Sequence, residues 1–286
     1  MELKDWILLT ALAAIWGSAF MFIKISAVVF GPILLVTLRL LIAGLVFMPL
    51  LLQKKNRLLF KPYLPAILII ALVSNAMPFT LFAYASLGAT SNMLGILNGT
   101  TAFLTTIIAY FWLKESVTSK QIIGLILGFI GVLILVNPSN GSTTFIASVC
   151  AMIGSLCYAF NATYLQRHHS NSDKKVLIGW SMLFGGFFMA PIAFFNLPSE
   201  MPDTNSILAL LWLAVVSTGI GYLAYVRLID RIGAVKTATL TYLLPVFSIL
   251  WGALFLKEQI TLIIFCGFMF VMMGMYFANT KKKLKS

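Results

Sequence analysis

Charged residues are scarce in this 286-residue chain, and acidic residues are the scarcest of them. Charged side chains make up 10% of the sequence and hydrophobic ones 60%, whereas a soluble domain carries about 25% charged residues. A chain so poor in charge cannot have water as its main solvent, which excludes a soluble globular protein. Because only helices and closed barrels satisfy their backbone groups in lipid, the long apolar runs predict an all-α integral membrane protein.

Asp and Glu together number eight, and their positions leave long stretches without a carboxylate. None occurs between Asp5 and Glu115, or between Glu115 and Asp173. Since intramembrane ionisable groups mark ion pathways, this absence gives no support to a proton relay through a mid-membrane carboxylate. Facilitated diffusion, exchange and coupling through the charge of a substrate stay open.

Histidine and cysteine are rarer still, with two and three residues. Both histidines lie in one predicted loop, at His168 and His169, and the three cysteines, Cys150, Cys157 and Cys266, fall inside apolar runs. An odd, buried set argues against a disulfide framework or a metal site, so we expect these thiols to pack as small apolar groups and expect no cofactor. The scarcity of acids, bases and metal ligands makes an intramembrane enzyme the less favoured alternative.

Ten apolar runs are long enough to cross a bilayer, which takes about 20 residues each. Short connections with turn residues, such as Gly31-Pro32 and the stretch 137–141, separate them. The first run is too long for the core of a signal peptide, so we expect a retained first helix. The predicted spans are 6–27, 33–52, 64–87, 91–112, 119–136, 143–164, 175–195, 206–228, 235–256 and 260–279.

Basic residues give the chain a net charge of +12, which on a soluble fold would point to nucleic acid. With the N-terminus in the cytoplasm, all of the 20 Lys and Arg residues except Lys24, Arg39 and Lys257 lie on the cytoplasmic side. This is the bias of the positive-inside rule. We therefore expect a multi-pass protein of the bacterial inner membrane with both termini cytoplasmic. The lipid bilayer is an expected partner and nucleic acid is not, while monomer and homodimer stay open.

A tandem repeat underlies the spans. Leu113-Lys114-Glu115 recurs 143 residues later as Leu256-Lys257-Glu258, and Val73-Ser74 recurs at the same offset as Val216-Ser217. Because each copy holds five spans, an odd number, the second copy enters the membrane in the opposite orientation. We predict two inverted five-helix repeats around a central cavity, at 1–138 and 143–280, followed by a basic cytoplasmic tail at 281–286.

Three segments carry a family resemblance. The first span contains Ala14-Ile15-Trp16-Gly17-Ser18, the second has Pro32 followed by Arg39, and the ninth leads from Leu244-Pro245-Val246 to the second Lys-Glu copy. In this order they resemble the drug/metabolite transporter superfamily, in particular its EamA-type ten-helix branch. One departure is Ala102, which stands where the second copy has Pro245.

The resemblance implies a ten-helix fold of two inverted repeats. Its central cavity is built mainly by the first, third, fourth, sixth, eighth and ninth helices, with the fifth and tenth peripheral. Members of the family carry amino acids and other small metabolites, often as exporters.

Uncharged polar and aromatic residues recur at helical spacing on the helices that the resemblance assigns to the cavity. Asn75 and Phe79 lie one turn apart on the third, and Asn98 and Thr101 on the fourth. This spacing places each pair on one helix face, and Asn is costly against lipid. The expected substrate-binding residues are Trp16, Asn75, Phe79, Asn98, Thr101, Tyr158, Asn161, Tyr222, Tyr225, Thr241 and Tyr242.

Each of these residues also has a purely structural interpretation. Ser and Thr in membrane helices bond their own backbone or a neighbouring helix, and packing can satisfy the amide of an asparagine. Trp16 either stacks on a planar substrate or packs within its repeat. The glycines at 124, 131, 267 and 274 have the spacing of close helix packing.

Two charged residues fall within spans. Arg39 lies in the second span, which is peripheral in the resembling fold, so we expect it to order loop or helix-end carbonyls. Lys24 lies near the outer end of the first helix, where we expect it to snorkel to the interface.

The leading functional hypothesis is a carrier for a small metabolite that works by alternating access around an aromatic-lined cavity. The aromatic content of 13% favours a substrate such as an amino acid. The alternatives are an intramembrane lipid-modifying enzyme, and a channel or lipid scramblase on the same helical bundle. Import and export stay open.

Overall fold

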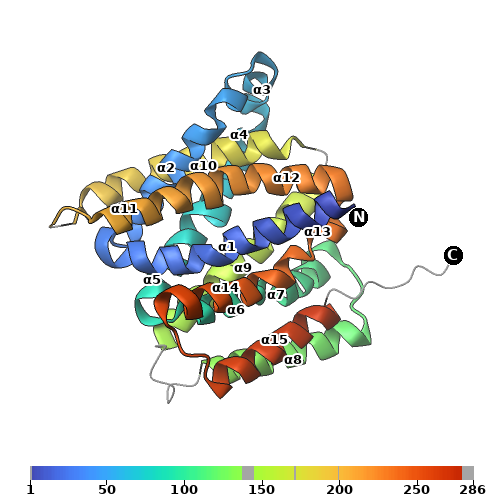
Figure 1. Ribbon diagram of the computed structural model, residues 1–286. Coiled ribbons are helices and arrows are strands. Elements are labelled where there is room, and N and C mark those ends of the chain that lie inside the picture. The colour runs from blue at the N-terminus through green and yellow to red at the C-terminus, as the bar shows by residue number, and fades with distance from the viewer. Residues whose placement is uncertain (1, 137–144, 171, 199, 279–286) are drawn as a thin grey trace.

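Helices form all the regular structure in the residues that the computed structural model describes, which are 2–136, 145–170, 172–198 and 200–278. Most of them lie side by side in one bundle (Figure 1). The predicted turn at 137–141 and the predicted tail at 281–286 fall outside the described residues.

The element order follows the repeat, and η marks a π-helical segment. The first half holds α1 (Leu3–Phe30), α2 (Pro32–Leu51), α3 (Lys54–Leu58), α4 (Phe60–Ile70), η1 (Ala71–Ala76), α5 (Met77–Gly88), α6 (Ser91–Gly99), α7 (Thr101–Ile108), η2 (Ala109–Leu113) and α8 (Ser119–Leu135). The second half holds α9 (Phe145–His168), α10 (Lys174–Phe194), α11 (Thr204–Leu211), η4 (Trp212–Ile220), α12 (Gly221–Ile232), α13 (Ala234–Thr237), α14 (Leu240–Leu256) and α15 (Leu262–Ala278).

Each predicted span overlaps one helix or a run of helical elements. Seven have the length and hydropathy to cross a membrane, among them the composite runs Phe60–Gly88, Ser91–Leu113 and Thr204–Ile232. The other three, α8, α14 and α15, are apolar helices of 17 residues, or about 25 Å at 1.5 Å per residue. The prediction of an all-helical membrane fold is confirmed.

The ninth span begins later than predicted. A short helix, α13, ends at Thr237, and the backbone then turns through bonds of the i to i+3 type, from Thr239 to Lys236 and from Thr241 to Ala238. Such tight turns end one helix before the next begins, so α14 starts at Leu240.

Corresponding helices of the two copies pack against each other. The α8 helix pairs with α15 along one edge of the bundle, and α2 pairs with α10 (Figure 1). Glycine allows the first of these contacts: a Cβ on Gly124 would lie 2.7 Å from the carbonyl oxygen of Gly274, and one on Gly274 would lie 2.6 Å from the amide nitrogen of Gly128. The predicted role of these glycines in close packing is confirmed.

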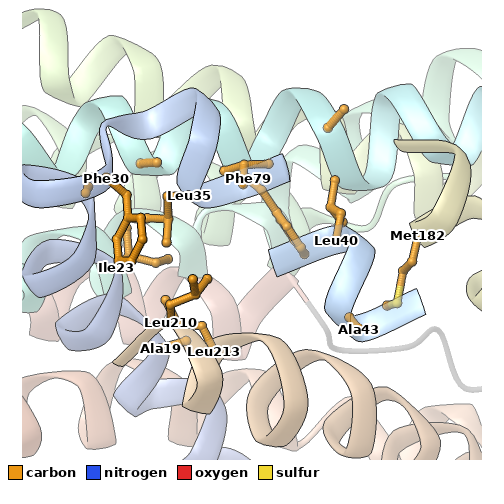
Figure 2. Packing of buried hydrophobic residues seen from close by; sticks show 14 of the residues in the cluster. Ala19, Ile23, Phe30, Leu35, Leu40, Ala43, Phe79, Met182, Leu210 and Leu213 are labelled. Carbon is orange, nitrogen blue, oxygen red and sulfur yellow. The ribbon is translucent and has the colours of Figure 1, made fainter. Parts of the chain in front are cut away.

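A buried apolar cluster joins the two halves of the chain (Figure 2). It contains Leu40 and Phe79 from the first half and Met182, Leu210 and Leu213 from the second. Because lipid tails are as apolar as leucine, van der Waals packing is what stabilises such a cluster in a membrane. The cluster fixes α2, α5 and η4 relative to one another, and these elements carry the polar residues of the candidate site.

Candidate functional site

Two π-helical segments lie at corresponding positions of the two copies. The η1 segment covers Ala71–Ala76, which the offset of 143 maps onto residues 214–219 within η4 (Trp212–Ile220). Such segments are rare and frequently mark functional sites. In η4 the wide turn lets the Thr218 hydroxyl donate to the carbonyl of Leu213, 2.7 Å away and five residues back, which leaves the hydroxyl oxygen free to accept.

Arg39 is the partner of that oxygen. Its Nε donates to Thr218 Oγ1 at 2.8 Å, and its guanidinium carbon lies 3.9 Å from the ring centroid of Phe79. A cation over an aromatic ring in a desolvated place is worth about 2 kcal/mol. The prediction that Arg39 orders loop or helix-end carbonyls is wrong. Its bonded partner is a side chain 179 residues away, which the packing of α2 against η4 brings to it.

Further aromatic rings adjoin Phe79 and the segment that carries Thr218. Trp16 lies 5.3 Å from Tyr222 and 5.2 Å from Tyr225 between ring centroids, and its indole nitrogen donates to the carbonyl of Ser217 at 2.8 Å. Tyr158 lies 6.5 Å from Phe79, and Tyr158 and Tyr222 are within electrostatic range of the guanidinium. We call Trp16, Arg39, Phe79, Tyr158, Thr218, Tyr222 and Tyr225 the Arg39 cluster.

The cluster brings together elements from both halves. Trp16, Arg39 and Phe79 come from α1, α2 and α5, whereas Tyr158, Thr218 and Tyr222 come from α9, η4 and α12. Five predicted binding residues are therefore neighbours: Trp16, Phe79, Tyr158, Tyr222 and Tyr225. Arg39 and Thr218 are the members that the sequence-based list of binding residues lacks. The sequence did carry a signal for Arg39, because it is a cationic residue within a span and no carboxylate lies near it in the sequence.

Three other predicted residues are engaged in local or helix–helix bonds. Asn75 is 2% exposed and donates from Nδ2 to Ser181 Oγ on α10 at 3.0 Å. The Tyr242 hydroxyl donates to the carbonyl of Met275 on α15 at 2.9 Å. Thr241 donates to the carbonyl of Ala238 at 2.7 Å. These bonds match the structural interpretation of the three side chains.

The remaining predicted residues lie on α6, α7 and α9, which are in mutual contact. Thr101 Oγ1 and Asn161 Oδ1 are buried and have no hydrogen-bond partner in the part of the chain that the structure describes, and Asn98 is half-buried. A buried acceptor without a partner is costly, and a ligand that donates to it removes that cost.

Near one end of the bundle, Glu258 links three segments. Its Oε1 accepts from the Ser91 backbone N–H at 2.8 Å, and its Oε2 accepts from the Asn92 N–H at 3.0 Å and from Ser91 Oγ at 2.9 Å. Lys24 Nζ lies 3.6 Å from Oε1 and donates to the carbonyl of Ala89 at 2.8 Å. The expectation that Lys24 snorkels to the interface stays a prediction, and the structure adds that this carboxylate and carbonyl hold its charge.

A surface hollow of about 440 Å³ lies elsewhere, at the turn between α1 and α2. Its lining includes Phe30, Pro32, Tyr84, Phe195 and Leu197, and it is open to the outside. Tyr84 and Asn196 are the polar side chains of its lining, and none of the described residues that line it is charged. The Arg39 cluster combines a charge, a hydroxyl and aromatic rings, so the chemistry of recognition favours it as the candidate site.

Comparisons with known proteins identify relatives that are named as membrane transporters. The sequence profile of the EamA-like transporter family matches residues 4–137 and again 145–280. The chain is 27% identical to the uncharacterized transporter YvbV of Bacillus subtilis (97% of this chain, 92% of the relative). It is also 27% identical to a probable amino-acid metabolite efflux pump of Escherichia coli (96% and 95%). A solved crystal structure matches with a TM-score of 0.69 at 17% identity, covering 97% of both chains, and so shares the fold.

Proposed function

This chain belongs to the EamA-like transporter family and is a membrane transporter, and we propose that it carries a small metabolite such as an amino acid by alternating access. The observation that carries the proposal is the Arg39 cluster, in which polar and aromatic side chains from both halves of the chain meet inside an otherwise apolar bundle. Ligand sites of repeat-built transporters lie at such a junction between repeats.

Two observations support an inverted arrangement of the repeats, at 1–138 and 143–280. The family profile matches once in each half, and the α8–α15 and α2–α10 pairs are both formed by corresponding helices. A pseudo-two-fold axis in the membrane plane produces such self-pairing and allows each end to open in turn. The proposal includes the charge-derived orientation, with both termini in the cytoplasm of a bacterial cell.

The substrate contacts that we propose are the aromatic members of the cluster, Trp16, Phe79, Tyr158, Tyr222 and Tyr225. Asn98, Thr101 and Asn161 complete the site as polar contacts, and Asn75, Thr241 and Tyr242 position their helices. The printed name of the Escherichia coli relative, a probable amino-acid metabolite efflux pump, supports amino acids and export.

The test is counterflow in proteoliposomes loaded with unlabelled amino acids and supplied with labelled ones. We expect saturable uptake that Trp16→Ala and Tyr222→Ala reduce at least tenfold, because each removes part of one aromatic wall. Tyr110→Ala, at a half-exposed tyrosine on η2, is the matched control and should leave uptake unchanged.

Other outcomes would assign another function. Flux that does not saturate would indicate a channel, lipid redistribution without metabolite flux would indicate a scramblase, and a modified lipid product would indicate an enzyme. An equal loss in the Tyr110→Ala control would refute the proposed location of the site.

A further inference from the structure

Arg39 is a buried cation without an anionic partner in the described residues. Ion pairs there join Lys24 to Glu258, Lys175 to Asp230, and Arg231 to Glu2 and Asp5. Arg39 is 7% exposed, and its one hydrogen bond within the described residues runs from Nε to neutral Thr218. Charged side chains inside a membrane are costly and are normally paired or functional.

The other half of the molecule shows that packing does not require this charge. At the offset of 143, Arg39 corresponds to Met182 and Thr218 corresponds to Asn75. The matching contact, between η1 and α10, is made by the neutral bond from Asn75 Nδ2 to Ser181 Oγ. Since an amide and a hydroxyl join α10 to η1, joining α2 to η4 does not by itself call for a guanidinium.

The two terminal nitrogens of the Arg39 guanidinium are not engaged by the described residues. Thr218 already donates to Leu213, so it accepts from Nε, and the N–H groups of the two terminal nitrogens make no hydrogen bond within the described residues. A guanidinium presents these donors as a rigid fork that matches a carboxylate. Phe79 covers one face of the guanidinium. The rings of Tyr222 and Tyr225 pack on Trp16, whose indole bonds to the carbonyl of Ser217, next to Thr218.

We infer that Arg39 binds the carboxylate of the transported compound, which is an organic anion or a zwitterion with an apolar or aromatic part. The inference rests on the proposed transport function and names the substrate class of that site. A bound carboxylate supplies the negative charge that Arg39 lacks among the described residues. Substrate binding then neutralises Arg39 without any carboxylate of the protein.

The binding test uses two probes of nearly equal shape, phenylacetate and phenylacetamide, on purified full-length protein in detergent. Thermal unfolding is followed against the concentration of each probe, with sodium chloride at equal ionic strength as the reference. A charge-assisted, bidentate contact is worth about 10- to 100-fold in affinity. We expect phenylacetate to stabilise the protein at concentrations at least tenfold lower than phenylacetamide, and sodium chloride to have no effect of that size.

Two variants separate recognition from structure. Arg39→Met installs the residue of the corresponding position, and we expect it to respond equally to both probes while unfolding, without probe, at the wild-type temperature or above. An unpaired buried charge costs stability, so its removal should not lower it. Arg39→Lys keeps the charge but loses the planar fork of donors, and should retain a preference for phenylacetate that is about threefold weaker than that of the wild type. Ser181→Ala, in the matching neutral contact, should keep the full preference.

Several results would overturn the inference. These are equal responses of the wild type to both probes, no response to either, or an undiminished preference in Arg39→Met. If Arg39→Met does not fold, an undiminished preference in Arg39→Lys overturns it, and a diminished one supports it.

Counterflow separates this inference from the transport proposal. Arg39-dependent binding of phenylacetate without any amino-acid counterflow would keep the carboxylate site and reject the carrier. Saturable counterflow that is unchanged in Arg39→Met would keep the carrier and reject the role of Arg39.

Discussion

The chain turns at Lys114-Glu115 and again at Lys257-Glu258, and we call these two turns the Lys-Glu corners. They share one backbone conformation and differ in what their glutamate side chains bind. Lys114 and Lys257 both adopt a left-handed conformation, with φ of 58° and 54°. The following amides bond to corresponding carbonyls, Glu115 to Ala109 at 3.3 Å and Glu258 to Gly252 at 3.1 Å. The repeat therefore preserves the corner itself, including a strained φ that side chains rarely adopt.

The glutamate side chains differ sharply. The Glu258 side chain is 7% exposed and holds the start of α6 and Lys24, whereas Glu115 is exposed and accepts one hydrogen bond from Gln166 Nε2 at 3.0 Å. A carboxylate on the first amides of a helix also meets the positive end of the helix dipole. We call the two regions the Glu258 end and the Glu115 end. In this conformation the Glu258 side chain holds the start of α6 and Lys24 together. A carrier with symmetric repeats would have to break these contacts when its other end closes.

The largest expected effect comes from removing the bound glutamate. Glu258→Ala leaves two backbone amides, the Ser91 hydroxyl and Lys24 without their acceptor, so we expect the free energy of unfolding in detergent to fall by about 2–4 kcal/mol. Glu115→Ala, the matched control, should change it by less than about 0.5 kcal/mol because that side chain is exposed. Chemical denaturation of both variants measures the difference, and equal losses would show that the two ends are equally bound.

A smaller effect isolates the lysine. Lys24→Met keeps the apolar stem but removes the ion pair with Glu258 and the bond to the Ala89 carbonyl, for an expected loss of about 1 kcal/mol. Exposed Lys120 gives the control, Lys120→Met, with no measurable loss. If Lys24→Met costs as much as Glu258→Ala, the ion pair and not the start of α6 accounts for the stability of the Glu258 end.

The backbone of the corners can be compared directly. Glycine adopts positive φ without the penalty of a side chain, so Lys114→Gly and Lys257→Gly should each stabilise the protein by about 0.5 kcal/mol. Lys120→Gly, within α8, should destabilise it instead. The two corner variants should agree in sign and size when their thermal unfolding is compared. Opposite signs would mean that the corners, and not only their glutamates, have diverged.

Sequence reasoning succeeded where the information is local. The hydropathy of each run predicted the helices, and the seven-residue spacing of the α8 and α15 glycines predicted a contact that brings Gly124 within van der Waals reach of Gly274. Helical spacing selected Phe79 and Tyr222, which the fold brings to Arg39. The start of α14 was missed because the turn at 236–241 contains neither Gly nor Pro, the residues that most often mark a turn in a sequence.

Reasoning from single helices did not find the partners of the charged residues. The partners of Lys24 and Arg39 are 65 and 179 residues away, so no spacing along one helix predicts them. The repeat singled out Glu258 but could not tell that it differs from Glu115, because the difference arises from the element that each corner meets. Asn75 was chosen for its polarity, and its Ser181 partner, 106 residues away, shows how an amide inside a membrane is satisfied by packing.

The smallest expected effect concerns acid, and it distinguishes the two ends because both histidines lie at the Glu115 end. His169 is half-buried after α9, with its ring nitrogens 3.1 Å from Ser172 Oγ and 3.4 Å from the Tyr164 hydroxyl, and its ring against Tyr63. Burial, and secondarily the neighbouring His168, lower the pKa of His169 below its ordinary 6.5.

The unfolded chain therefore takes up the proton first, so the stability present above about pH 6.5 falls as the pH is lowered through the folded-state pKa. Thermal unfolding between pH 7.5 and about 5.5 avoids the range near pH 4 where carboxylates ordinarily titrate. His169→Gln should flatten the slope in that window while Glu258→Ala should keep it, and a slope unchanged by His169→Gln would mean that the acid response comes from outside the Glu115 end.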